Sequence, residues 1–354
     1  MAVRARDPEI IKIKQSGGKI YSISKCNTID NCLYEAYMQY ISDIPPDDSV
    51  YSVLGSGVHD TLEKIMNGKA DESELAMSLA QDLQKAEQKG LNFPKDKNGG
   101  DSIREKWVAD MTDFCEKFRR LPGEFETERL VIYPLDDKHY VQGYIDLVKH
   151  NEDGAVDIYD WKTSSNFSAA DLKHHGRQLA IYKTAMKHMG YTVNRTAWIM
   201  LKYIAVTDTV TGKVYPASRS QTVKDMQKPL ISILKKQGMD DETAALKVLT
   251  YGSLDDINRE FGNRFTTDLY IRDYAVTEET EKECLNYINN KIKVWEHHEK
   301  ENWKDIAPRD FIAVSGKGNI REDTFYCNNL CGYRKKCKYI ENFNHSRDED
   351  DGLF

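Results

Sequence analysis

Hydrophobic residues in the first third of the chain recur at the spacing of amphipathic helices. Leu62, Ile65 and Met66 fall on one face of a predicted helix, because positions three and four apart lie on the same side of a helix. Polar turns interrupt this pattern at Pro45–Asp48 and at Pro94–Gly100. The pattern predicts an extended lead-in over residues 1–25 and mainly helical stretches over 26–42 and 55–120.

From about residue 124 the pattern changes to short apolar runs of the kind that form strands. Turn signals such as Asp136-Asp137 and Asn151–Gly154 separate these runs. Strands that alternate with helices indicate an α/β fold, and we expect a mixed central sheet flanked by helices. The predicted strands are residues 125–135, 140–149, 155–162, 195–206 and 265–276, and the predicted helices are residues 169–189, 222–262 and 278–302.

The composition is that of a soluble globular protein and excludes a disordered or fibrous one. Of 354 residues, 40% are hydrophobic and 30% are charged. No apolar run approaches the roughly 20 residues that cross a bilayer, and the N-terminus lacks the apolar stretch of a signal peptide. We therefore expect no membrane association and a cytoplasmic location, in a bacterial or phage-infected cell.

The charge balance bears on binding to nucleic acid. Lysine and arginine number 50 against 57 acidic residues, which gives a formal net charge of −7. This balance excludes a generally basic protein, so any contact with DNA must come from local patches. Two basic groups, at 173–177 and 334–338, are candidates, and solvated helix faces are the alternative interpretation.

The candidate chemistry lies near the ends of two predicted strands. One strand ends in Gly143-Tyr144-Ile145-Asp146, and the next ends in Asp160-Trp161-Lys162-Thr163. A hairpin would bring Asp146 and Asp160 together, with Lys162 on the same face as Asp160 because strand side chains alternate. Two adjacent carboxylates persist when a divalent cation neutralises them, and a lysine beside them stabilises charge on a phosphate. This set suits phosphodiester hydrolysis; the alternative is an ion pair at a solvated strand end.

Three more side chains could belong to the same site. Gln178 and Tyr182 share one helical face and can hydrogen-bond a phosphate or an active-site group. His59, at the start of an upstream helix, could bind a metal through a neutral imidazole. The alternatives are a half-buried tyrosine with a surface glutamine, and a histidine with a structural role.

The ordered set of motifs resembles the PD-(D/E)XK nuclease superfamily. Within it, the set is most similar to RecB-like exonucleases, including AddB-type recombination nucleases and CRISPR-associated iron–sulfur exonucleases. The matching motifs are Gly-x-x-x-His at 55–59, Gly-x-x-Asp at 143–146, Asp-x-Lys-Thr at 160–163 and Gln-x-x-x-Tyr at 178–182. The resemblance implies a restriction-endonuclease-like core with a helical N-terminal region.

The resemblance also implies roles for these residues and a working cation, Mg²⁺ or Mn²⁺. Lys162 would position the nucleophilic water, while Gln178 and Tyr182 would contact DNA and support Lys162. A glutamate on the preceding strand often assists, and here either Glu126 or Glu128 could do so. The implied metal ligands are His59, Asp146, Asp160 and the main-chain carbonyl of Trp161.

The cysteines give a second candidate metal site. Cys327, Cys331 and Cys337 lie within eleven residues, which favours metal ligands over disulfides in a reducing compartment. Cys32 stands where the iron–sulfur branch has its distant fourth cysteine, although the gap between Cys327 and Cys331 is one residue longer than in that branch. Four thiolates suit either a [4Fe–4S] cluster or zinc. The other cysteines, Cys26, Cys115 and Cys284, are expected in the core.

Five regions follow from these assignments, and the last is an acidic tail. We expect the tail to be disordered, although its terminal Leu353 and Phe354 could dock on a protein partner. The C-terminal cysteine-rich segment would clamp the two chain ends together. The regions are a helical part (1–124), the nuclease core (125–215), a helical insertion with one returning strand and a long helix (216–310), the cysteine-rich closure (311–340) and the tail (341–354).

The resulting functional hypothesis is a metal-dependent DNA exonuclease that acts on DNA ends. The resemblance implies that the substrate is single-stranded or has free ends. It also implies a role in recombination, in repair, or in a phage or CRISPR pathway. The alternatives are an endonuclease of the same chemistry and a non-catalytic DNA-binding scaffold.

Overall fold

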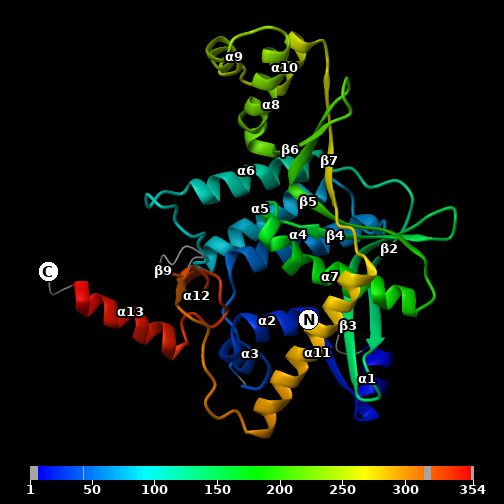
Figure 1. The fold of residues 1–354 in the computed structure, drawn as a ribbon, viewed down its shortest axis with the longest axis vertical. Helices are drawn as coiled ribbons and strands as arrows, with labels where there is room; N and C mark the ends of the chain where they lie inside the picture. The colour runs from blue at the N-terminus through cyan, green and yellow to red at the C-terminus, as the bar shows by residue number, and fades with distance from the viewer. Residues whose placement is uncertain (1–6, 43, 315–319, 352–354) are drawn as a thin grey trace.

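A mixed sheet lies at the centre of the computed structural model, which describes residues 7–42, 44–314 and 320–351 (Figure 1). Strands β3, β4 and β5 form its middle, with β3 antiparallel to β4 and β4 parallel to β5. The sheet consists of β1 (Lys19–Ser22), β2 (Glu124–Pro134), β3 (His139–His150), β4 (Val156–Lys162), β5 (Val193–Asp208), β6 (Val214–Ser218) and β7 (Phe265–Asp273). The prediction of a mixed α/β fold is confirmed.

Helices cover both faces of this sheet. The helices of the first half are α1 (Pro8–Gln15), α2 (Ile23–Asn31), α3 (Leu33–Tyr40), α4 (Val50–Met66), α5 (Glu74–Gln88), α6 (Ser102–Lys117) and α7 (Ala169–His188). The remaining helices are α8 (Thr222–Lys236), α9 (Asp241–Val248), α10 (Leu254–Phe261), α11 (Glu278–Lys300), α12 (Phe325–Asn329) and α13 (Lys338–Asp351). A small hairpin, β8 (Ile312–Val314) with β9 (Ile320–Glu322), lies apart from the main sheet.

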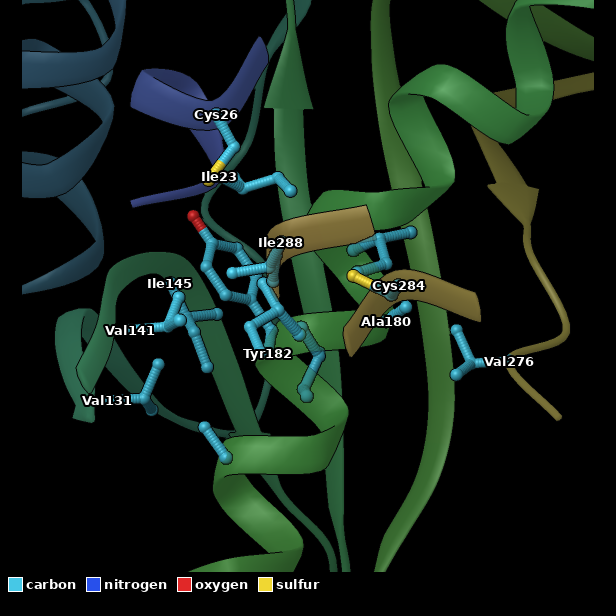
Figure 2. Packing of buried hydrophobic residues seen from close by; sticks show 14 of the residues in the cluster. Ile23, Cys26, Val131, Val141, Ile145, Ala180, Tyr182, Val276, Cys284 and Ile288 are labelled. Atoms are coloured by element: carbon cyan, nitrogen blue, oxygen red, sulfur yellow. The ribbon is translucent and has the colours of Figure 1, made fainter. Parts of the chain in front are cut away.

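Side-chain alternation along β4 divides the hydrophobic core into two parts. Val156 and Ile158 pack in a cluster with α2, α7 and α11, part of which is shown in Figure 2. Tyr159 and Trp161 point the other way, into a cluster with α4, α5 and α6. Because side chains two apart share a face, Asp160 belongs on the α7 side of the sheet. The core packing therefore decides which helix faces the candidate site.

A third hydrophobic cluster holds the segment between β5 and β7. Helices α8, α9 and α10 pack on one another around Met226, Leu230 and Ile257, and Val206 of β5 joins them to the sheet. Figure 1 shows this helical group at one end of the molecule, connected through β6 and β7. β7 then returns along β5, and α11 packs against α7 and α2. The long helix thus belongs to the main core.

Four local predictions were wrong or incomplete. The lead-in expected to be extended contains α1, whose start carries the usual signals of Asp7 as N-cap and proline at the first helical position. The helix expected over 26–42 breaks at Cys32, which is extended and caps α3. Strand β6 was not predicted. The tail expected to be disordered continues as helix α13 to Asp351, while Leu353 and Phe354 lie outside the described residues.

Other predictions were confirmed. Cys26, Cys115 and Cys284 are buried in the core, with at most 2% of each exposed. Within the residues that the structure describes, no helix combines the length and the apolar character needed to cross a membrane.

Candidate active site

The β3–β4 hairpin brings the two predicted aspartates together. Asp146 lies on β3 and Asp160 on β4, and the main-chain N–H of Trp161 donates to Asp146 Oδ2 at 2.9 Å. The Asp160 side chain is 2% exposed and that of Asp146 is 14% exposed. Two acidic side chains are therefore held close together and largely out of water, at the position that the sequence predicted.

A chain of hydrogen bonds connects these aspartates to α7. Lys162 forms an ion pair with Asp160, and its Nζ also donates to Gln178 Oε1 at 3.0 Å. Gln178 Nε2 donates to the Tyr182 hydroxyl at 2.9 Å, and that hydroxyl donates to the carbonyl of Tyr144 at 2.7 Å. The Gln178 amide accepts through its oxygen and donates through its nitrogen, so its orientation is fixed. We call these residues, with Asp146 and Asp160, the aspartate site.

The glycine of the Gly-x-x-Asp motif has a steric role here. Tyr182 packs so closely over Gly143 that a Cβ at that position would overlap its ring. The same ring lies in the core beside Val131, Val141 and Ile145 (Figure 2). The absence of a side chain at Gly143 thus allows Tyr182 to reach the backbone of β3 and to end the hydrogen-bond chain.

His59 approaches the site from α4, on the other side of Asp146. Its Nδ1 lies 3.6 Å from Asp146 Oδ2, and 29% of its side chain is exposed. The structure therefore brings His59, Asp146, Asp160, Lys162, Gln178 and Tyr182 together, with the main chain of Trp161 bonded to Asp146.

Burial and mutual repulsion perturb the proton affinity of this site. Loss of solvation raises the pKa of Asp146 well above its usual range, and the negative charge of Asp160 raises it further. The ammonium of Lys162 and the N–H of Trp161 oppose this rise in pKa. Burial also raises the pKa of Tyr182, so its hydroxyl keeps its proton and remains a donor. The raised pKa of Asp146 means that the pair disfavours two negative charges beside one lysine, and a bound cation would allow both aspartates to ionise.

The structure distinguishes between the two candidate glutamates. The β2–β3 register pairs Thr127 with Leu147 and Arg129 with Ile145, which places Glu128 across from Asp146. Glu128 also raises the pKa of Asp146 through its charge, and its backbone has a left-handed φ of 50°. Glu126 instead bonds Arg129 and His150, both at 2.8 Å. Counting outward from the Asp136-Asp137 turn would pair 128 with 145 and 127 with 146, one residue off the observed register, so the sequence alone did not identify the partner.

The donor set fits a small divalent cation of the magnesium type. In the described ranges, no three His, Cys, Asp or Glu side chains have the spacing of a complete ligand shell. Magnesium sites commonly use only one or two carboxylates, with water and substrate phosphate completing the shell. The buried pair Asp146 and Asp160 supplies that number, and its mutual repulsion would be relieved by a cation.

The four predicted cysteine ligands surround one small cavity. Cys32 caps the start of α3, and its Sγ accepts the N–H of Glu35 at 3.4 Å. Cys327 lies on α12, which ends at Asn329, and Cys331 follows two residues later. The cavity has a volume of about 20 Å³ and is lined by Cys32, Cys327, Cys331 and Cys337 together with aromatic residues. We call it the cysteine cavity.

Burial raises the proton affinity of the thiols in the cysteine cavity. Loss of solvation raises the pKa of Cys327 to about 11, and the pKa values of Cys32 and Cys331 also rise. Glu35, another buried acid, lies beside them and accepts a hydrogen bond from Tyr326 at 2.8 Å. The four thiols are chemically suited to a metal group, but among the described residues no three or more such side chains are arranged to hold an ion, so the thiols would have to draw closer to bind one.

The two basic groups predicted to guide DNA make contacts within the protein. Lys173 pairs with Glu283 of α11 at 2.8 Å, and Arg177 stacks 3.6 Å from the ring centroid of Tyr287. Arg334 donates to the carbonyl of Asp48 at 2.8 Å, and Lys336 pairs with Asp47 at 3.1 Å. These groups therefore fasten α7 to α11 and the cysteine segment to the 45–48 loop.

Comparison with known proteins identifies the family. A model of the PD-(D/E)XK nuclease superfamily matches residues 20–338. No curated protein sequence matches the chain. Because the family match covers most of the chain, the chain belongs to the PD-(D/E)XK nuclease superfamily, and its mixed sheet flanked by helices agrees with the restriction-endonuclease-like core. Membership implies a nuclease with a DNA substrate, of a kind that usually works with Mg²⁺ or Mn²⁺.

Proposed function

We propose that this member of the PD-(D/E)XK superfamily is an Mg²⁺- or Mn²⁺-dependent DNA exonuclease of the RecB-like branch that prefers single strands. The observation that carries the proposal is the convergence of Asp146, Asp160 and Lys162 from two strands, supported by the bonds through Gln178 and Tyr182. The exonuclease subtype rests on the ordered motifs of the sequence, as do roles in recombination, in repair, or in a phage or CRISPR pathway.

Asp146, Asp160, His59 and the carbonyl of Trp161 would hold the cation. A bound Mg²⁺ or Mn²⁺ would neutralise charge on the scissile phosphate and lower the pKa of a water molecule. Negative charge at Asp146 and Asp160 is concentrated where little solvent screens it, which favours binding of a divalent ion. Glu128, across from Asp146, would add to that negative field.

Lys162 would place its positive charge against the phosphate. Its ammonium has three N–H groups; the ion pair with Asp160 and the bond to Gln178 occupy two of them. The third N–H can donate to the attacking water or to a phosphate oxygen. Because Gln178 is itself fixed by Tyr182, Lys162 is held in place before substrate binds, which is how electrostatic catalysis avoids reorganisation.

The four-cysteine set would bind a metal group with a structural role. Cys32 and Cys337 lie at opposite ends of the chain yet line the same cavity. A metal there would connect the two ends around the core, so its binding free energy would add to folding stability. Both a [4Fe–4S] cluster and zinc use four thiolates, and the metal content of the purified protein distinguishes them.

Substitutions of two aspartates of strand β4 test the proposed activity. End-labelled linear DNA and circular single-stranded DNA are incubated with Mn²⁺ and with wild type, Asp160→Asn or Asp157→Asn. Asp157 is three positions away on β4 and bonds the Tyr159 hydroxyl at 3.3 Å, away from the site. We expect Asp160→Asn to lower cleavage of the linear strand by at least about a thousandfold, and Asp157→Asn to leave it nearly unchanged.

The other outcomes have separate meanings. Cutting of the circular strand would show an endonuclease. Binding without cleavage by the wild type would favour a DNA-binding scaffold. Equal cleavage by wild type and Asp160→Asn would remove the aspartate site from the reaction.

A further inference from the structure

A large groove lies between the sheet core and the helical group α8–α10, apart from the aspartate site. Its walls are the end of α6 with the following turn, the ends of β5 and β7, and the first turns of α8 and α10. Figure 1 shows α6 directly beside the helical group. The groove has a volume of about 1000 Å³, the upper end of the range for small-ligand pockets, and it suits an extended chain.

The groove has the opposite charge to the protein as a whole. Five basic and three acidic side chains line it, an excess of two positive charges in a protein of formal net charge −7. Lys117 and Arg219 share the single carboxylate of Asp113, so this trio keeps one positive charge. Arg119, Arg120 and Lys224 form no ion pair with any residue that the structure describes. These three cations exceed the two remaining acids of the lining, Asp255 and Asp268, by one charge, so they supply half of the positive excess of the groove.

Each of the three cations is placed to donate into the groove. Arg119 uses one nitrogen, Nη1, for the carbonyls of Glu116 and Phe118, so its other nitrogens remain available for a bidentate contact. Arg120 is anchored through Nη2 to the carbonyl of Met66 at 3.0 Å. Lys224 is exposed and lies in the first turn of α8, where the helix dipole favours negative groups and disfavours a lysine. An anion in the groove would relieve that repulsion.

The groove lies at a distance that a substrate strand can span. Ile204, which lines it, is on β5 four residues beyond Met200, the residue that pairs with Lys162. Four residues of a strand span about 13 Å, or roughly two phosphate-to-phosphate steps of an extended single strand. A strand that reaches the aspartate site could therefore continue into the groove.

We propose that this groove binds the sugar–phosphate backbone of a DNA strand whose end occupies the aspartate site. The proposal rests on the proposed function for the nature of the strand and adds a binding track contributed by Arg119, Arg120 and Lys224. Contacts to phosphates carry no base information, so binding here is independent of sequence and sensitive to salt. The helical group thus serves as one wall of the DNA track.

The test separates binding from cleavage by using the Lys162→Ala background throughout. Fluorescence anisotropy measures affinity for single strands of about 20 and about two nucleotides, because the shorter one cannot span the roughly 13 Å between the two sites. The groove variant is Arg119→Gln/Lys224→Gln, which keeps an amide donor at each position. The matched control, Lys12→Gln/Lys236→Gln, removes two exposed lysines on α1 and at the far end of α8.

We expect the groove variant to bind the longer strand roughly tenfold more weakly, with the slope of log K against log salt smaller by about 1.4. Affinity for the short strand should not change, and the control should match its parent for both strands. Equal affinity of groove variant and control, whether both are unchanged or both weakened, would overturn the proposal. If wild type does not cleave DNA but the groove variant alone loses affinity, the proposed nuclease activity fails and the track stands. Melting temperatures verify that both variants are folded.

Discussion

The aspartate site and the cysteine cavity both concentrate acidic side chains away from water, and in both places burial raises pKa values. They differ in how far apart their residues lie in the sequence. Asp146, Asp160 and Lys162 come from one hairpin, whereas Cys32 and Cys337 come from opposite ends of the chain. They also differ in the charged groups that surround their acidic side chains. The aspartates have Lys162 as a direct partner, whereas the thiols share their cavity with another acid, Glu35.

This difference predicts different consequences of mutation. The hairpin that forms the aspartate site is held by the hydrophobic clusters on both faces of the sheet, so its geometry does not depend on the charged residues. The cysteine cavity lies outside the large hydrophobic clusters, beside a small cluster of Met38, Cys331 and Tyr333, and polar contacts fasten its segment to the 45–48 loop. Changes at the first site should therefore affect catalysis, and changes at the second should affect stability.

The largest expected effect on stability is that of Cys331→Ser. We expect it to lower the free energy of unfolding by about 4 kcal/mol or more, because loss of one ligand to the proposed metal would remove the binding free energy that connects the two chain ends. Chemical denaturation measures this effect, and metal analysis of the wild type identifies iron or zinc. Wild type treated with a strong chelator should become as unstable as the variant, and the variant should not respond to the chelator.

The control for this change is Cys284→Ser, in which the replaced thiol is also buried but lies in the core between α7 and α11. In this variant the free energy of unfolding should fall by a smaller amount, about 1–2 kcal/mol, and the chelator should still destabilise the protein. If both serine variants keep that response, the cysteine cavity is not a metal site.

A pH titration tests the same comparison, and its expected effect on stability is smaller than that of Cys331→Ser. A thiol whose pKa is raised in the folded state stabilises the metal-free protein below its unfolded pKa, and this stability is lost as pH rises toward the folded value. For Cys327 the folded pKa is about 11, against about 8.5 in an unfolded chain. Metal-free protein should therefore lose stability between about pH 8.5 and pH 11.

Metal-loaded protein should respond in the opposite direction, because ligation requires thiolates and releases protons. Its resistance to a competing chelator should increase over the same pH range. Urea unfolding of both forms measures the two trends. Thiolate ligation would be contradicted if metal-loaded protein resisted the chelator equally well at the low and the high end of this pH range.

The parts predicted from sequence are those that local rules control. Alternation along β4 and the β3–β4 hairpin place Asp160, Lys162 and Asp146 without reference to the rest of the chain. The spacing of Gln178 and Tyr182 sets one helical face in the same way. Helix α13 was missed because its acidic composition suggested disorder, although residues 338–351 contain no proline or glycine to end a helix.

Long-range contacts could not be predicted from these rules. Arg177 looked available for DNA, yet its partner Tyr287 is contributed by α11, about a hundred residues later. The groove cations had no sequence signal, because Arg119 and Lys224 are also about a hundred residues apart and share a surface only once β5 and β7 pair. Glu128 and Glu126 both suited the motif, and only the register separated them.

The smallest expected effect is that of Tyr182→Phe, which keeps the ring over Gly143 and removes the hydroxyl. Gln178 then loses its acceptor and the Tyr144 carbonyl loses its donor, so Lys162 is less firmly oriented while both aspartates stay in place. We expect cleavage to fall by roughly tenfold and stability by about 1–2 kcal/mol, the cost of losing a buried hydrogen bond. Tyr159→Phe is the control, because its hydroxyl bonds Asp157 outside the site and its loss should not slow cleavage. If Tyr182→Phe cleaves as fast as Tyr159→Phe, the hydrogen-bond chain from α7 holds the fold and does not position the lysine, and the aspartate site then depends on the β3–β4 hairpin alone.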